Sequence, residues 1–259
     1  MANETLRLYS EPYENGFMPT LTTYLCDEET RGAVIVFPGG GYKHYGSKEQ
    51  VTIAKRFNEL GFHAFVVIYS VAPNHYPAPQ RDGFRAIKMV RANAEKYHVD
   101  PSKIAVCGFS AGGHLAGSLG VLAREFECIC GDEIDKQDQR PDAVIMSYPV
   151  VTFTGDHRGA GSALSLIGKR DPELEEYLSL QNRISEDTPP TFCWITADDQ
   201  AVDYQNPVIF AMEMWKQSRP CELHIFPSGP HGQGLNVGRD DVCQWSSLAA
   251  TFLRTTCGF

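Results

Sequence analysis

The sequence predicts an α/β fold, built on one mostly parallel sheet of about eight strands flanked by helices. Two observations support this fold class. Short, continuous apolar runs recur along the chain, and runs of this kind suit strands that are buried on both faces of a parallel sheet. Segments with helical periodicity separate them, as expected for right-handed β–α–β units. The runs occupy residues 33–37, 64–68, 104–107, 143–146, 192–195 and 223–226.

The remaining elements follow from local signals. Residues 6–9 and 21–25 alternate more strongly in polarity and predict an antiparallel pair at the edge of the sheet. Gly61 ends the first predicted helix as a C′ glycine. Residues 152–188 are long, polar and irregular, and they predict a lid or substrate-binding excursion within a single domain that covers residues 1–259. Helices are predicted at residues 48–60, 81–97, 113–124, 207–217 and 242–253.

Composition excludes several classes of partner. The net charge of −9 argues against nucleic-acid and anionic-membrane partners, which need clustered Lys and Arg. No stretch approaches the roughly 20 consecutive apolar residues of a membrane helix, and the first residues lack the basic and apolar segments of a secretory leader. We therefore expect a cytoplasmic protein whose eight cysteines are reduced thiols. No Cys or His pattern completes a zinc set, so no metal is expected.

A candidate nucleophile follows the apolar run at residues 104–107. Residues 108–112 read Gly-Phe-Ser-Ala-Gly and lie between a predicted strand and a predicted helix. This is the structural context that the G-x-S-x-G elbow requires. The tight turn lifts the Ser110 hydroxyl clear of the sheet, and the helix N-terminus behind it favours developing negative charge.

A second glycine-rich turn follows the run at residues 33–37. Residues 38–42 read Pro-Gly-Gly-Gly-Tyr, at the position of an H-G-G-G oxyanion loop with Pro38 in place of His. The backbone N–H groups of Gly40 and Gly41, together with that of Ala111, are the predicted oxyanion donors. No Gly-Lys-Ser/Thr sequence follows, which excludes a phosphate-binding P-loop.

A serine nucleophile needs a base, and the base needs an orienting carboxylate. His231 lies in the loop just after the strand predicted at residues 223–226, where the base of such a triad belongs. The acid is expected in the loop after the preceding strand. Asp199 is the preferred residue, Asp198 remains an alternative, and Asp203 also suits a cap of the next helix.

Candidate substrate contacts lie beside these motifs. Tyr42, Tyr45 and Tyr76 are predicted to stack on a sugar, with ordinary packing as the alternative interpretation. His114 lies on the nucleophile helix, too close in sequence to reach back over the serine, and is expected to pack in the core.

With these residues in place, the chain resembles the acetylxylan-esterase-like branch of the α/β-hydrolases, related to carboxylesterases of the hormone-sensitive-lipase type. The most specific matches are Pro-Gly-Gly-Gly-Tyr at 38–42 and Gly-Phe-Ser-Ala-Gly-Gly-His-Leu-Ala at 108–116. The chain departs from the family where Asp203 replaces the Pro of a Val-Pro pair after the acid. Further matches include Ser47, Glu49 and residues 76–82, 147–150, 189–192, 196–199 and 222–226.

The resemblance implies an α/β-hydrolase fold and a serine carboxylesterase that needs no cofactor. Its expected partner is a small-molecule ester, and the activity usually assigned to the family is deacetylation of xylan-derived oligosaccharides. Three alternatives stay open: a general short-chain carboxylesterase, a peptidase or formamidase that uses the same triad, and a non-catalytic binding protein that keeps the fold. Acyl length and oligomeric state are left open as well.

Overall fold

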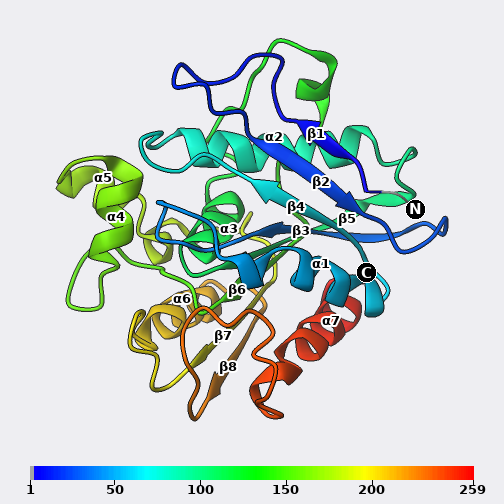
Figure 1. The fold of residues 1–259 in the computed structure, drawn as a ribbon. Coiled ribbons are helices and arrows are strands. Elements are labelled where there is room, and N and C mark those ends of the chain that lie inside the picture. Colours follow the sequence, from blue (N-terminus) through cyan, green and yellow to red (C-terminus); the bar gives the residue numbers. More distant parts are fainter. Residues whose placement is uncertain (1–2) are drawn as a thin grey trace.

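The computed structural model describes residues 3–259 and is centred on an eight-stranded sheet with the order β1-β2-β4-β3-β5-β6-β7-β8 (Figure 1). From β4 to β8 all neighbouring strands are parallel. The predicted α/β class is therefore confirmed. The strands are β1 Thr5–Arg7, β2 Thr20–Tyr24, β3 Arg31–Phe37, β4 His63–Ile68, β5 Val99–Phe109, β6 Ala143–Ser147, β7 Thr191–Thr196 and β8 Cys221–Phe226.

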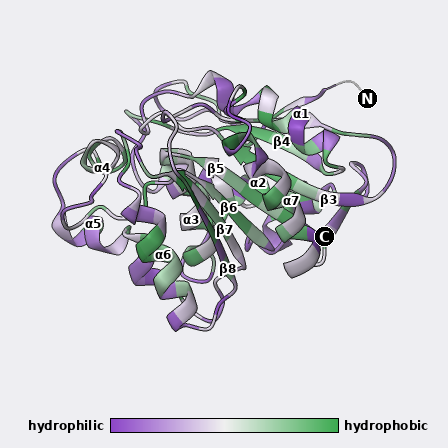
Figure 2. Ribbon diagram, turned by 90° about the horizontal axis from the view of Figure 1, so that it is seen from below, coloured by the Kyte–Doolittle hydropathy of each residue, from purple (hydrophilic) through white to green (hydrophobic). Residues whose placement is uncertain are grey.

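The antiparallel pair predicted at the edge of the sheet is also present. β1 pairs antiparallel with β2, and β2 pairs antiparallel with β4. The central strands are buried along nearly their whole length, as their continuous apolar runs predict. In Figure 2 the hydrophobic residues gather on the sheet, while hydrophilic residues concentrate in the peripheral loops. Because β3, β5, β6, β7 and β8 run parallel, their carboxyl ends lie at the same edge of the sheet.

Helices cover both faces of the sheet. α1 and α7 pack together on one face, and α2 and α3 pack together on the other (Figures 1 and 2). Gly61 has φ +86° directly after α1 and its flanking turn, as expected for a C′ glycine. No helix within residues 3–259 combines the length and the apolar character that crossing a bilayer requires. The helices are α1 Val51–Glu59, α2 Ala78–Ala92, α3 Ala111–Val121, α4 Ala160–Ile167, α5 Pro172–Tyr177, α6 Gln205–Lys216 and α7 Trp245–Thr256.

The excursion at residues 152–188 is more ordered than the sequence predicted, because it contains α4 and α5. α4 ends at Gly168, whose φ of +83° is left-handed. α5 begins after Asp171, whose side chain accepts the N–H of Leu174, and has Pro172 in its first turn. These cap signals are local, but helices of six to eight residues bury too little surface to show a clear apolar period.

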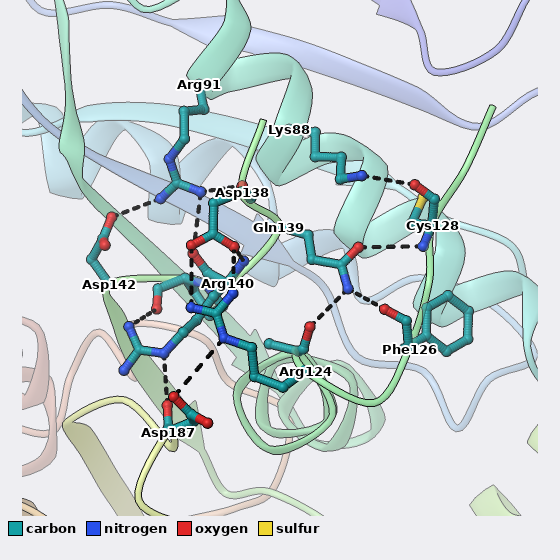
Figure 3. A network of polar contacts seen from close by, with 12 residues as sticks. Lys88, Arg91, Arg124, Phe126, Cys128, Asp138, Gln139, Arg140, Asp142 and Asp187 are labelled. Carbon is teal, nitrogen blue, oxygen red and sulfur yellow. Dashed lines mark hydrogen bonds and ion pairs between the residues drawn. The ribbon is translucent and has the colours of Figure 1, made fainter. Parts of the chain in front are cut away.

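A polar network holds the segment between α3 and β6 against α2 (Figure 3). Lys88 Nζ donates to the carbonyl of Cys128 at 2.8 Å, and Arg91 Nη2 donates to Asp142 Oδ2 at 2.9 Å. Gln139 accepts the N–H of Cys128 at 3.3 Å and donates to nearby carbonyls. Asp142 Oδ2 also accepts the N–H of Ile104 in β5 at 2.9 Å, so the network ties α2 to the strand that precedes Ser110.

Candidate active site

The turn that carries Ser110, the predicted nucleophile, has a strained backbone. Ser110 lies between β5 and α3 with φ 53° and ψ −116°, a conformation rare for non-glycine residues. Its N–H donates to the carbonyl of Ser147 at 3.0 Å, at the end of the neighbouring strand. A Cβ at Gly108 would lie 1.9 Å from the carbonyl oxygen of Gly112, and one at Gly112 would lie 2.3 Å from that of Phe37. Both glycines are therefore required by close backbone contact.

Three of the predicted side chains form a continuous chain of hydrogen bonds. Ser110 Oγ lies 2.9 Å from His231 Nε2, and His231 Nδ1 lies 2.7 Å from Asp199 Oδ2. The Asp199 side chain is 1% exposed and that of His231 is 21% exposed. The other Asp199 oxygen accepts the N–H groups of Ala201 and Val202, which fixes the carboxylate in the loop after β7.

The two alternative acids lie in other contacts. Asp198 Oδ1 accepts the N–H of Gly229 at 2.8 Å and so braces the loop that carries His231. Asp203 Oδ2 lies 2.8 Å from His157 Nδ1, and its Oδ1 accepts the N–H of Gln205 at the start of α6. Neither is the carboxylate bonded to His231.

The glycine loop after β3 presents backbone donors to the same region. Gly40 has φ +130° and Gly41 has φ +64°, and a Cβ at Gly40 would lie 2.0 Å from the carbonyl oxygen of His44. Within residues 3–259 the N–H groups of Gly40, Gly41 and Ala111 have no hydrogen-bond acceptor. Free donors of this kind suit a developing oxyanion.

A cavity of about 440 Å³ opens over Ser110 and His231. Its walls come from the glycine loop, from the His231 loop and from α4, which supplies Gly161 and Ser162. Within residues 3–259 no group of three or more His, Cys, Asp or Glu side chains is arranged to hold a metal ion. The lining residues are Gly40, Gly41, Lys43, His44, Gly46, Glu49, Ser110, Gly161, Ser162, His231 and Gly232.

The prediction that Tyr42 stacks on a sugar is wrong. Tyr42 is 0% exposed, and its hydroxyl lies 2.9 Å from Nδ1 of His114, which is itself buried as expected. Its φ of +58° sets it in a tight turn, and its ring packs edge-on against Tyr69 in the core. Tyr45 and Tyr76 are half-buried, and neither of them lines the cavity.

Sequence reasoning missed the part that Glu49 and Tyr148 play in this site. Glu49 is 3% exposed, and its carboxylate accepts the N–H of Gly39 at 2.7 Å and the hydroxyl of Tyr148 at 2.6 Å. The Tyr148 ring lies edge-on to the His231 imidazole, with centroids 4.8 Å apart. Burial, followed by the charge of Glu49, raises the pKa of Tyr148 well above its ordinary value. Glu49 and Tyr148 are both among the residues that match the family, but nothing in the sequence around either residue indicates that the two side chains are hydrogen-bonded.

Comparison with known proteins supports an ester hydrolase. The BD-FAE family model matches residues 22–214. The chain is 36% identical to the endo-1,4-beta-xylanase B of Butyrivibrio fibrisolvens over 92% of its length, and 28% identical to an acetylxylan esterase of Xylanibacter ruminicola over 84%. It spans only 38% and 44% of these two curated relatives.

A solved structure extends the similarity to the whole fold. The crystal structure of an acetyl ester-xyloside bifunctional hydrolase from Caldicellulosiruptor lactoaceticus superposes with a TM-score of 0.93 at 37% identity, covering 99% of this chain and 97% of that one. The family model, these relatives and the mostly parallel sheet agree with the resemblance in the motifs. The chain therefore belongs to the BD-FAE family, within the α/β-hydrolase superfamily.

Proposed function

We propose that this chain is a serine carboxylesterase that removes small acyl groups, above all acetyl groups, from xylan-derived oligosaccharides. The observation that carries the proposal is the hydrogen-bonded chain from Ser110 through His231 to Asp199. The names of the two xylan-related hydrolases and of the acetylxylan esterase support the acetyl and xylan parts of the proposal.

In the proposed mechanism, His231 Nε2 takes the proton of Ser110 Oγ as this oxygen attacks the ester carbonyl. Asp199 accepts the Nδ1–H of His231 and holds the required tautomer. The N–H groups of Gly40, Gly41 and Ala111 bind the oxyanion of the tetrahedral intermediate. His231 then protonates the departing alcohol, and a water activated by the same imidazole hydrolyses the acyl-enzyme.

The cavity lining supports a small acyl group. Five of its eleven lining residues are glycines, and α4 adds only Gly161 and Ser162. Residues 152–188 thus act, in this proposal, as a substrate-binding wall of one catalytic domain. The partner is a small-molecule ester whose sugar lies against polar groups such as Lys43 and His44 rather than against a tyrosine.

Xyloside cleavage, which the name of the solved relative includes, is not part of the proposal. Glycoside hydrolysis ordinarily uses two carboxylates that flank the scissile bond. The cavity instead combines a serine and a histidine with Glu49, whose two oxygens both already accept hydrogen bonds. A general short-chain carboxylesterase and a peptidase or formamidase are the outcomes against which the proposal is tested.

The test is acetate release from acetylated xylo-oligosaccharides, run beside p-nitrophenyl acetate, butyrate and octanoate. We expect rapid release with acetate strongly preferred, and a loss of about 10⁴- to 10⁶-fold in kcat for Ser110→Ala. A fluorophosphonate probe should label the wild type and fail to label Ser110→Ala. Turnover of simple esters without release from the sugars would leave a general carboxylesterase, and preferred cleavage of amides would leave a peptidase or formamidase. Full activity of Ser110→Ala would overturn the nucleophile itself.

A further inference from the structure

We propose that Glu49 and Tyr148 are positioning residues that lock the oxyanion loop to the loop of the catalytic histidine. This inference rests on the proposed function, because it concerns the rate of the same reaction. It assigns neither residue a contact with substrate atoms that react. The two loops keep their relative placement through one buried hydrogen-bonded link, and turnover falls when this link is cut.

The first half of the link is the carboxylate of Glu49. It reaches from the turn before α1 under the glycine loop and accepts the N–H of Gly39 at 2.7 Å. A Cβ at Gly39 would lie 2.9 Å from Glu49 Oε2 and 3.0 Å from the Cβ of Ser110. A Cβ at Gly46 would lie 2.3 Å from the same carboxylate oxygen. The carboxylate of Glu49 is therefore packed against two glycines, Gly39 and Gly46, and Gly39 is also in close contact with Ser110.

The second half of the link is Tyr148, which directly follows β6. Its φ of +37° and the donation of its N–H to the carbonyl of Trp194 at 2.6 Å hold its backbone. Its hydroxyl donates to Glu49 Oε1 at 2.6 Å and accepts the N–H of Gly234 at 3.0 Å. Gly234 lies three residues after His231, and the Tyr148 ring packs against the imidazole.

The complete link runs from the N–H of Gly39 through Glu49 and the Tyr148 hydroxyl to the N–H of Gly234. Every member is buried or nearly so, and a buried charge is stabilised only when its hydrogen bonds are satisfied. Breaking one of these hydrogen bonds leaves a donor or an acceptor unpaired. The glycine loop after β3 and the His231 loop are then no longer held in a fixed position relative to each other. Oxyanion donors and base must be placed to within a fraction of an ångström, so small shifts slow the chemical step.

The effect should appear in kcat rather than in KM. The oxyanion and the imidazolium exist only along the reaction path, whereas the ground-state ester makes little use of either. A purely structural role would instead lower stability and leave the turnover of the folded protein intact. Asp82 offers a matched control, because it is a buried carboxylate that also accepts a backbone N–H and tyrosine hydroxyls, at residues that do not line the cavity.

The experiment compares Glu49→Gln, Tyr148→Phe and the double variant, with Asp82→Asn as control, using p-nitrophenyl acetate and thermal unfolding. The amide that Glu49→Gln introduces can accept from only one of the two donors, and Tyr148→Phe keeps the ring beside His231 while removing the hydroxyl. We expect each single variant to lose about 10- to 100-fold in kcat with KM within about threefold. The kcat of the double variant should be no lower than that of the less active single variant, because both substitutions break the same hydrogen-bonded link. Asp82→Asn should keep kcat within about twofold.

Unchanged kcat in folded Glu49→Gln and Tyr148→Phe would overturn the inference. So would additive losses in the double variant, or an equal loss of kcat in Asp82→Asn. The rate of fluorophosphonate labelling separates this failure from failure of the proposed function. A wild type that is not labelled at Ser110 refutes the proposed function, whereas wild type and Glu49→Gln labelled at equal rates refute only the positioning role.

Discussion

Glu49 and Asp82 are two buried carboxylates with nearly the same local chemistry. Glu49 is 3% exposed and Asp82 is 0% exposed. Each accepts one backbone N–H and at least one tyrosine hydroxyl, at distances between 2.6 and 2.9 Å. Glu49 lies between the loops that line the cavity, whereas Asp82 ties the chain before β2 to α2 and to the segment after β4. Position relative to the cavity, rather than bonding pattern, separates the two.

A buried carboxylate whose hydrogen bonds are all satisfied is therefore not by itself a mark of function. Both groups are fully hydrogen-bonded, and both join segments that are distant in sequence. Burial raises the pKa of Asp82 to about 6, despite the donors around it. What distinguishes Glu49 is that its partners lead directly to the glycine loop after β3 and to the imidazole of His231.

The largest effect on kcat is expected for a second pair of carboxylates, the adjacent residues Asp198 and Asp199. Asp199→Asn should lower kcat about 10⁴-fold, because an amide at this position favours the wrong tautomer of His231. Asp198→Asn should change kcat less than about tenfold, since its carboxylate contacts the N–H of Gly229 and not the imidazole. Steady-state kinetics with p-nitrophenyl acetate measures both.

Equal losses in the two variants would show that the loop after β7 acts as a whole, and a larger loss in Asp198→Asn would reverse the assignment of the acid. Thermal unfolding of both variants serves as the control. Comparable melting temperatures would attribute the difference in kcat to the imidazole contact alone.

A smaller effect is expected in the dependence of stability on pH. Burial lowers the pKa of His114 from 6.5 to about 4, so the unfolded chain binds this proton more readily than the folded protein between those values. His114 therefore makes the free energy of unfolding fall by up to about 3 kcal/mol as pH falls through this window. Asp82 acts in the opposite sense: its folded pKa of about 6 lies above the ordinary 3.8, so its contribution to stability grows as pH falls over nearly the same range.

Urea unfolding between pH 7 and pH 4.5 separates the two contributions. Asp82→Asn should steepen the loss of stability on acidification relative to wild type, and His114→Gln should reduce or reverse it. Gln is chosen because it can donate to the carbonyl of Leu178 and accept from Tyr42, as the imidazole does. Parallel pH profiles for both variants and the wild type would show that neither group titrates differently in the folded protein.

The sequence allowed the sheet, its antiparallel edge and the positions of Ser110 and His231 to be predicted, because each depends on a local pattern: an apolar run, a glycine turn or a loop just after a strand. Asp198 and Asp199 are not separable in this way, since adjacent side chains in a turn point to different partners. The bond between Glu49 and Tyr148 joins residues 99 positions apart. No periodicity or spacing rule indicates such a contact.

The prediction for Tyr42 failed for a related reason. Its place beside the glycine loop suggested exposure, but exposure depends on the direction of the side chain, which the backbone sets through a φ of +58°. α4 and α5 were missed because short helices depend on their caps and on tertiary packing more than on an apolar period. Local signals thus place the strands and the turn that carries Ser110, and tertiary contacts decide which polar groups surround them.

The smallest predicted effect tests this last point. Tyr42→Phe removes a hydroxyl that lies 2.9 Å from His114 Nδ1 in the core, and should cost about 1–2 kcal/mol of stability by leaving that nitrogen without a donor. Because Tyr42 is 0% exposed and does not line the cavity, KM for acetylated xylo-oligosaccharides should remain within about twofold of wild type. Tyr45→Phe is the matched control, since its hydroxyl also bonds to the protein, at the carbonyl of Tyr69, but from a half-buried position. A selective rise in KM for the sugar in Tyr42→Phe, with unchanged stability, would contradict this prediction. It would mean that the Tyr42 ring contacts the substrate in solution, although the ring is buried in the structure.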